Sequence, residues 1–256
     1  MSAFGQEKVM GMVLAASNYG EYDKRLVLLT REYGKITVFA KGARKPSSPL
    51  LGCSQAFVFG EFTVFRGRTS YTLNSAEVTN YFEELRDDIE AMYYGFYFCE
   101  FAEYLTRENV PANDMLLLLY QSLRVLIQKV LPFELVRAVF ELKILAYNGE
   151  AFYTRGCVRC QKQEDSLLTY SVVAGGFVCG NCKTLYPDVS LFRAGTARAV
   201  RHILGAGVKN VFDFNVSPEI LEELKTFAEA WCKKRVEHSF HSLPFLEMFS
   251  APVLVP

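Results

Sequence analysis

Two Cys-x-x-Cys units, at residues 157–160 and 179–182, stand 18 residues apart in the sequence. This doubled spacing is typical of a zinc ribbon, in which each unit forms a tight turn that presents two thiolates to a metal ion. Four sulfur ligands fill a tetrahedral Zn²⁺ shell and leave no position for water or substrate. The sequence therefore predicts a structural zinc site with the ligands Cys157, Cys160, Cys179 and Cys182.

The same cysteines also suit a redox dithiol pair or a set of unrelated thiols. A thioredoxin-type motif places one Cys-x-x-Cys at a strand-to-helix junction of a βαβ unit, and the sequence shows no such unit. The chain has seven cysteines, an odd number, and Cys53, Cys99 and Cys232 are isolated. The cysteines of a secreted, disulfide-bonded protein are not arranged in this way, so we expect a protein of the reducing cytoplasm.

Short β-strand patterns fill the first 80 residues. Five runs that favour strands lie at residues 10–16, 25–30, 35–40, 56–65 and 69–77. Turn signals separate the first three runs, and a polar, basic loop with two prolines precedes the fourth. Five short strands and a basic loop predict a small closed or nearly closed barrel of the OB type. The pattern alone leaves an SH3-like barrel open.

From about residue 80 the apolar residues take on a helical period. They recur at spacings of three and four at 89–105 and 114–130, and Pro132 opens a third helix that ends at Asn148-Gly149. A later helix starts at Ser217-Pro218-Glu219, which supplies a capping hydroxyl, a proline in the first turn and a carboxylate near the positive end of the helix dipole.

These patterns predict a multidomain α+β fold. An OB-fold nucleic-acid-binding domain at 1–80 precedes an all-α helical domain at 81–256. The cysteine pairs lie in an insert of the helical domain, at about 151–187, which we expect to form a zinc ribbon-like motif.

The formal net charge of zero hides an uneven distribution along the chain. Residues 1–82 carry ten Lys or Arg and six Asp or Glu, a net charge of +4, whereas residues 83–150 carry six and twelve, a net charge of −6. A polyanion is therefore expected to bind first at the N-terminal end. The predicted DNA-binding residues are nine of its ten basic residues: Lys24, Arg25, Arg31, Lys35, Lys41, Arg44, Lys45, Arg66 and Arg68.

The densest part of this basic set is Lys41-Gly-Ala-Arg44-Lys45, whose glycine lets the backbone approach a phosphate closely. Aromatic residues are interleaved with the basic ones, as stacking on unpaired bases requires. They are Tyr19, Tyr22, Tyr33, Phe39 and Tyr71. Basic residues at strand ends are often merely solvated, and most such aromatic residues belong to a core. The pattern favours nucleic-acid binding without showing which rings face outward.

No catalytic constellation is recognisable in the sequence. It has no Walker-type phosphate loop, no GxGxxG opening a helix and no GxSxG elbow. His238 and His241 lack a third ligand in any recognised pattern, so we expect them to be surface histidines. The longest apolar run, at 115–120, is too short for a membrane span, and residues 9–16 suit a first strand better than a signal peptide. We therefore predict a binding protein, not an enzyme, without a membrane segment.

Three N-terminal stretches and the cysteine array resemble a known family. The stretches are Tyr-Gly-Glu-Tyr-Asp-Lys at 19–24, Leu-Leu-Thr-Arg-Glu-Tyr-Gly-Lys-Ile at 28–36 and Ala-Lys-Gly-Ala-Arg-Lys-Pro at 40–46. Asn148-Gly149 and the two cysteine pairs, with Gly175-Gly176 between them, follow in matching order. Together they resemble the RecO family of bacterial DNA recombination and repair mediator proteins over essentially the whole chain. The chain departs at Ser48-Pro49, where the family often has a basic residue.

The resemblance implies an N-terminal OB domain and a C-terminal helical domain with a zinc-binding insert. It implies binding to single- and double-stranded DNA, annealing of complementary strands and a cytoplasmic, nucleoid-associated location in bacteria. Such proteins cooperate with a RecR-type partner to load the RecA recombinase onto strands coated by single-stranded-DNA-binding protein. They also contact the acidic C-terminal tail of that coating protein, for which Arg124 and Arg137 are candidate donors in this chain.

Two alternatives come from different functional classes. The same barrel and zinc insert suit an RNA-binding factor of transcription or translation, which a comparison of matched RNA and DNA strands would separate from a repair protein. An enzyme with an unrecognised site is the second alternative. Activity that depends on His238 or His241 and survives the loss of DNA binding would favour it.

Overall fold

The chain folds into two compact units. The computed structural model describes residues 5–68, 70–163 and 167–250. The first unit comprises Met1–Ile127 and Ser239–Pro256, and the second comprises Gln128–His238. Within the described ranges, no helix combines the length and the apolar character that crossing a membrane requires.

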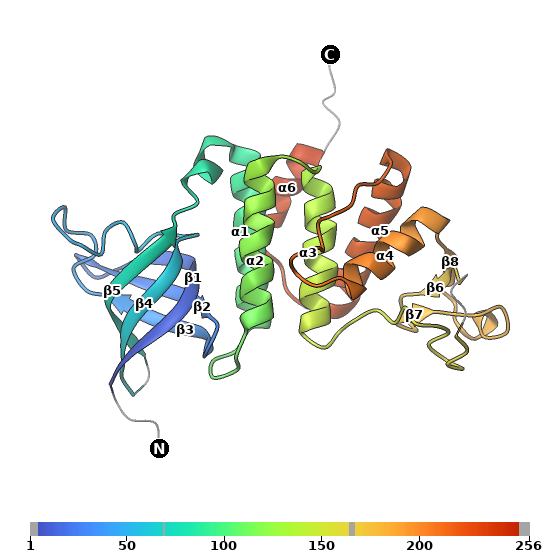
Figure 1. Cartoon of the computed structure of the whole chain (residues 1–256), viewed down its shortest axis with the longest axis horizontal. Helices are drawn as coiled ribbons and strands as arrows, with labels where there is room; N and C mark the ends of the chain where they lie inside the picture. The colour runs from blue at the N-terminus through green and yellow to red at the C-terminus, as the bar shows by residue number, and fades with distance from the viewer. Residues whose placement is uncertain (1–4, 69, 164–166, 251–256) are drawn as a thin grey trace, which may run out of the picture. The chain divides into compact units, whose positions relative to one another are not determined.

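A closed barrel of five strands forms the N-terminal part of the first unit (Figure 1). The strands are β1 (Gln6–Tyr19), β2 (Asp23–Thr30), β3 (Gly34–Ala40), β4 (Phe59–Arg66) and β5 (Tyr71–Asn80). They are hydrogen-bonded in the order β1-β2-β3-β5-β4, and β4 returns to β1. The pair β3–β5 is parallel and the other pairs are antiparallel. This is the arrangement of an OB-like barrel, and the predicted fold class is confirmed.

Alternation of side chains along the strands fills the barrel. In β3, Ile36, Val38 and Ala40 are buried in the core, whereas Thr37 and Phe39 between them are half-buried. Successive residues of a strand point to opposite faces, so this period of two places the apolar set inside. The long β1 serves both sides of the barrel because it pairs with β4 in its first half and with β2 in its second.

Two strands begin later than the sequence predicts. Phe57, expected inside the fourth strand, has a φ of +73° and lies in the loop before β4. Left-handed backbone cannot continue a strand, so the alternating pattern extended three residues too far towards the N-terminus. The fifth strand was expected from residue 69, which lies outside the described residues, and β5 begins at Tyr71.

Three helices and a short 3₁₀ helix complete the first unit. They are η1 (Glu83–Asp87), α1 (Ile89–Leu105), α2 (Asn113–Gln128) and α6 (Leu243–Ser250). The Asp88 side chain caps α1 by accepting a hydrogen bond of 3.0 Å from the Ala91 N–H. Positive φ at Lys129 ends α2 before residue 130, the predicted end. α6 packs on α1, where the rings of Tyr93 and Phe245 stack with centroids 4.7 Å apart.

The second unit contains three helices and the cysteine-bearing insert. The helices are α3 (Phe133–Tyr147), α4 (Ala194–Gly205) and α5 (Pro218–Arg235). Gly149, with a φ of +88°, ends α3 as predicted, and Pro218 occupies the first turn of α5. The buried Lys143 of α3 donates to the carbonyls of Leu204 and Ala206, and so places a cation at the C-terminal end of α4.

The insert is a three-stranded sheet held by aromatic packing. Its strands β6 (Thr169–Ser171), β7 (Gly176–Phe177) and β8 (Ser190–Leu191) are very short, and a 3₁₀ turn, η2 (Lys183–Leu185), lies between the last two. Phe152 packs edge-on against Phe227 and Trp231 of α5, with centroid distances of 5.0 and 5.3 Å. These contacts attach the insert to α5.

Candidate functional site

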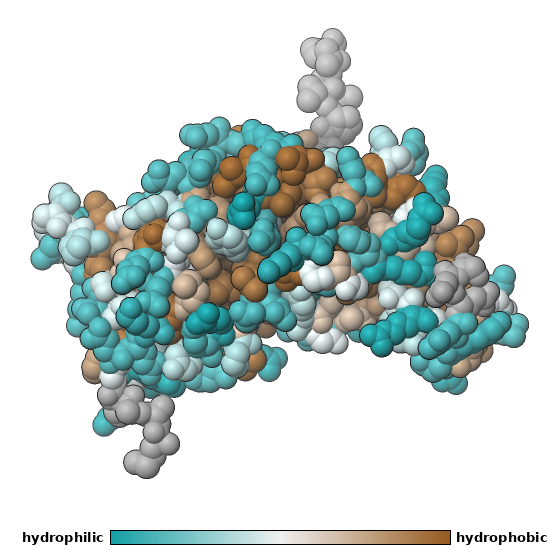
Figure 2. All heavy atoms as spheres, in the orientation of Figure 1, coloured by the Kyte–Doolittle hydropathy of each residue, from teal (hydrophilic) through white to brown (hydrophobic). Residues whose placement is uncertain are grey.

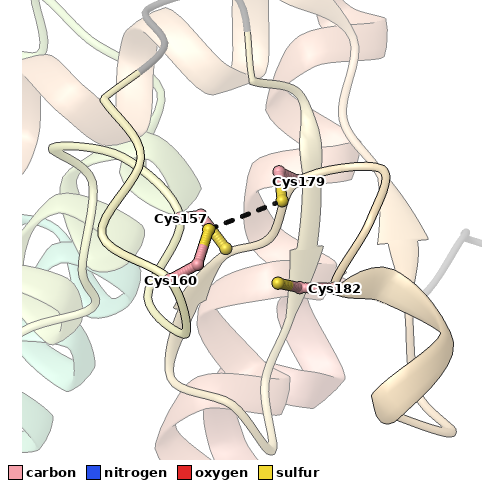
Figure 3. A group of neighbouring side chains, drawn as sticks. All are labelled: Cys157, Cys160, Cys179 and Cys182. Atoms are coloured by element: carbon pink, nitrogen blue, oxygen red, sulfur yellow. Dashed lines mark hydrogen bonds between the residues drawn. The ribbon is translucent and has the colours of Figure 1, made fainter.

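The two Cys-x-x-Cys units face each other at one end of the insert (Figure 3). Each unit forms a turn: the Gln161 N–H donates to the Cys157 carbonyl at 2.8 Å, and the Cys182 N–H donates to the Cys179 carbonyl at 3.0 Å. The four Sγ atoms all lie within 4.8 Å of one another, and no disulfide joins these cysteines. Four thiols so close together can hold a metal ion.

The dimensions and chemistry of the cluster fit Zn²⁺. Zn–S bonds of about 2.3 Å in a tetrahedron place the sulfurs ~3.8 Å apart, and the Sγ atoms of Cys160 and Cys179 are 3.7 Å apart. Burial opposes ionisation of Cys157, but backbone N–H groups of the two turns lower its pKa to about 6. Burial and the neighbouring cysteines raise the pKa of Cys182 to about 12. Four thiolates therefore need a cation to hold them together.

A glycine pair, Gly175-Gly176, shapes the hairpin beside the cysteines. Gly175 has a φ of +79°, which the turn between β6 and β7 requires. A Cβ at Gly176 would lie 2.9 Å from the Cβ atoms of Tyr153 and Val158, so a larger residue does not fit. The Val158 N–H donates to the Phe177 carbonyl at 2.8 Å, and this bond ties the first cysteine turn to β7.

Asp188 stabilises the same hairpin, and its replacement by asparagine is expected to weaken the insert. Its carboxylate accepts hydrogen bonds from the Ser171 hydroxyl at 2.5 Å and from the Val173 N–H at 2.8 Å. Burial alone would raise the Asp188 pKa, but these bonds outweigh it and lower the pKa. Asp188→Asn should reduce the free energy of unfolding by about 1–2 kcal/mol at pH 7, as expected for hydrogen bonds to a charged group.

The effect of Asp188→Asn should depend on pH. A depressed folded-state pKa stabilises the protein above the unfolded pKa and loses this contribution as pH falls through the folded value. Urea unfolding of the wild type and of Asp188→Asn can be followed by tryptophan fluorescence. The difference between their free energies of unfolding should be largest at pH 7 and should shrink on acidification. A difference independent of pH would contradict this role of the carboxylate.

The structure divides the nine predicted DNA-binding residues into two groups. Five of them gather at the start of β2 and in the loop after β3, and we name them the basic cluster: Lys24, Arg25, Lys41, Arg44 and Lys45. The Arg44 N–H bonds to the Tyr22 carbonyl at 2.9 Å, which holds the loop against the β1–β2 turn. Hydrophilic residues cover much of the visible barrel surface (Figure 2).

Of the other four basic residues, two lie at the opposite ends of β2 and β3, and two lie at the end of β4 and just after it. They are Arg31, Lys35, Arg66 and Arg68. Arg31 lies seven positions after Lys24 along an extended chain, a distance of about 23 Å. Arg31 pairs with Glu32 at 2.8 Å, Lys35 donates to the Glu103 carbonyl at 2.6 Å, and Arg66 lies 4.0 Å from Glu7. The DNA-binding role of all nine residues stays a prediction.

Only some of the interleaved aromatic residues face solvent. Tyr19 is 54% exposed and Tyr22 is 46% exposed, whereas Tyr71 is buried in the barrel core. The Lys45 ammonium lies 5.4 Å from the centroid of the Tyr22 ring, and the Tyr19 ring packs on Phe39 at 4.8 Å. The two tyrosines therefore border the basic cluster, and about half of each residue's surface is exposed. The Gly42 N–H donates to the Asp23 carboxylate at 2.7 Å.

Sequence reasoning missed Arg86, which lies near the basic cluster. Its guanidinium donates to the Gln55 side chain. Burial lowers the pKa of Lys24, and the positive charges of Arg44 and Arg86 lower it further, so the three cations are close neighbours. In the sequence Arg86 stands inside an acidic run at 83–90, which concealed it.

The remaining predicted residues are distributed over both units. Arg124 is exposed on α2 in the first unit, whereas Arg137 is half-buried on α3 in the second and bonds to Glu141 at 2.7 Å. His238 and His241 are both exposed. In the part of the chain that the structure describes, neither histidine belongs to a group of three or more metal-binding side chains.

Comparison with known proteins assigns the family. The model of the N-terminal region of Recombination protein O matches residues 1–82, and the model of its C-terminal region matches residues 86–244. A DNA repair protein RecO from Acetivibrio thermocellus is 31% identical over 94% of this chain and 96% of its own length. A DNA repair protein RecO from Alkaliphilus metalliredigens is 30% identical over 92% and 96%. The chain therefore belongs to the RecO family of DNA repair proteins.

Proposed function

We propose that this protein is a recombination mediator that binds single- and double-stranded DNA, anneals complementary strands and helps to load a recombinase onto strands coated by single-stranded-DNA-binding protein. The observation that carries the proposal is the basic cluster, bordered by the exposed rings of Tyr19 and Tyr22, on an OB-like barrel. Membership of a DNA repair family supports DNA as the ligand of this surface.

Annealing requires two polyanions to be brought together. Lysine and arginine side chains do this by displacing condensed counterions, without a covalent step or a cofactor. Contacts to phosphates and to stacked base faces tolerate any sequence, as an annealing protein needs. The basic cluster supplies the first kind of contact, and the two tyrosines supply the second.

The remaining components of the proposal are a metal and two protein partners. The four cysteines would hold Zn²⁺, which links the two cysteine turns of the insert. The zinc is then structural, and the barrel makes the contacts to DNA. A RecR-type partner and the acidic tail of the single-stranded-DNA-binding protein complete the assembly, with RecA receiving the strand. Arg124 and Arg137 remain the candidate donors to that tail, although Arg137 would have to share its bond with Glu141.

Binding measured on matched DNA and RNA strands over a salt series tests this proposal. We expect tighter binding to DNA than to RNA, little dependence on sequence and a linear fall in log affinity with log salt. A clear preference for RNA would instead support an RNA-binding factor of transcription or translation.

Removal of the exposed rings is expected to weaken binding to single strands selectively. Tyr22→Ala or Tyr19→Ala should each lower the affinity for single-stranded DNA about tenfold, because a stacked base contributes roughly 1–3 kcal/mol. Tyr22→Phe keeps the ring and should retain most of the affinity. Phe65 is 50% exposed on β4, away from the cluster, so Phe65→Ala is the control. Equal losses for the tyrosine variants and the control would contradict a stacking role.

A further inference from the structure

A groove of about 510 Å³ lies in the first unit beside the basic cluster. Its walls come from β1, from the loop before β4 and from α1, and Lys24 and Arg86 form part of its rim. The volume falls within the range of small-molecule sites, about 300–1,000 Å³. The groove therefore has room for one nucleotide.

The floor of the groove is apolar and firmly positioned. The half-buried ring of Phe96 packs on the buried ring of Phe57 with centroids 4.8 Å apart, and the half-buried Met92 also lines the groove. Gly95 in the middle of α1 makes room for Phe57, because a Cβ at Gly95 would lie 3.2 Å from the Phe57 ring. Aromatic and thioether surfaces of this kind suit the flat face of a nucleobase.

The rim near Lys24 is cationic and lacks a counterion. Lys24 is half-buried and donates to the Ser54 carbonyl at 2.7 Å, and Arg86 donates to Gln55. Among the described residues neither cation forms an ion pair with a carboxylate. The lowered pKa of Lys24, caused by burial and then by Arg44 and Arg86, shows that these positive charges repel one another. An anion placed between them would relieve this repulsion.

The opposite wall carries carboxylates. Glu100 and Glu103 of α1 line the groove, and Glu100 already accepts hydrogen bonds from the N–H and hydroxyl of Ser242, at 3.2 and 3.0 Å. Carboxylates disfavour an acidic peptide that runs the length of the groove. They do accept hydrogen bonds from the exocyclic amino groups of bases.

We propose that this groove binds one unstacked nucleotide of single-stranded DNA, with its base on the half-buried Phe96 and Met92 and its phosphate between Lys24 and Arg86. The inference rests on the proposed function, because the strand reaches the groove from the basic cluster past Arg44. A paired base cannot enter the groove. The site therefore distinguishes single strands from duplexes. It also holds one strand with a base unstacked from its neighbours while a complementary strand approaches.

Two substitutions test whether a nucleotide of single-stranded DNA binds in the groove. Ala16 is exposed and lines the groove, so Ala16→Leu narrows it without a charge change, and Arg86→Gln removes a cation from the rim. Each should lower the affinity for single-stranded DNA roughly tenfold. Ala16→Leu should leave the affinity for duplex DNA, and for a single strand with abasic sites, within about twofold. Ala230→Leu and Arg107→Gln, at exposed positions outside the groove, are the matched controls.

The outcomes separate this inference from the proposed function. An Ala16→Leu variant with unchanged melting and unchanged single-strand affinity would overturn the nucleotide site, as would equal losses on abasic or duplex DNA. Loss of affinity for an Asp/Glu-rich peptide, with DNA binding intact, would overturn it in favour of a peptide site. Failure of the proposed function has a different signature, because the wild-type protein would then not bind DNA in a salt-dependent way.

Discussion

Replacement of both Cys157 and Cys160 by serine is expected to abolish zinc binding and to detach the insert from α5. The three strands of the insert have only two or three residues each, too few to be stable without a further constraint. Structural zinc sites contribute on the order of 10 kcal/mol to the folding of small domains, so the loss should exceed what the aromatic packing can offset.

Trp231 provides a direct measurement of this detachment. It is the single tryptophan of the chain, and it packs edge-on against Phe152 at the start of the insert. Zinc content should fall from one ion per chain to none in the double variant, with a red shift of the tryptophan emission as the ring becomes exposed. Cys53→Ser removes a thiol outside the cluster and should keep its zinc. A stable, zinc-free double variant with unchanged emission would disprove a structural metal.

Simultaneous replacement of Lys41, Arg44 and Lys45 by alanine is expected to weaken DNA binding about 100-fold at 0.1 M salt. Each phosphate contact on a single strand contributes about 0.7 to the slope of log affinity against log salt, and thus ~0.7 log units at that concentration. The three contacts together should lower the slope by about 2 and affect all DNA sequences alike. Fluorescence anisotropy of labelled strands from 50 to 300 mM salt measures both quantities.

The control for this variant removes the same charge elsewhere. Lys209, Lys233 and Lys234 are exposed in the second unit, and their triple replacement by alanine should change affinity and slope little. If the two triple variants lost affinity equally, the effect would come from net charge and not from the basic cluster. An unchanged slope in the first variant would remove the cluster from the DNA-binding surface.

Local patterns were sufficient to predict the five barrel strands and the helices α1, α2, α3 and α5, whereas α4, α6 and the short strands of the insert were not assigned. The helical period at 89–105 matches α1, and alternation located the barrel strands to within a few residues. The spacing of the cysteines predicted their convergence, because a Cys-x-x-Cys turn needs few long-range contacts to form. Errors arose where backbone conformation overrides the apolar pattern, as at Phe57 and Lys129, both of which have positive φ.

Contacts between distant segments could not be predicted in the same way. Ser242 bonds to Glu100 across 142 residues, and this return of the chain places α6 in the first unit. The predicted domain boundary near residue 80 marks the change from strands to helices, whereas the first compact unit continues to Ile127.

The candidate DNA site was predictable as a set of charges but not as a surface. The sequence does not show that Lys24 and Arg31 lie at opposite ends of β2. Nor does it show that Tyr19 faces solvent whereas Tyr71 fills the core. Arg86 stands among acidic neighbours in the sequence, and only folding brings it close to Lys24.

Annealing of two complementary dye-labelled strands, bare and coated with the cognate single-stranded-DNA-binding protein, tests the central claim most directly. The measurement covers a salt series and compares the wild type with the Lys41, Arg44 and Lys45 triple variant. We expect the wild type to accelerate annealing in both states, with the acceleration lost at high salt and in the variant. Tight DNA binding without any acceleration would contradict a recombination mediator and leave a nucleic-acid-binding barrel with a cysteine insert.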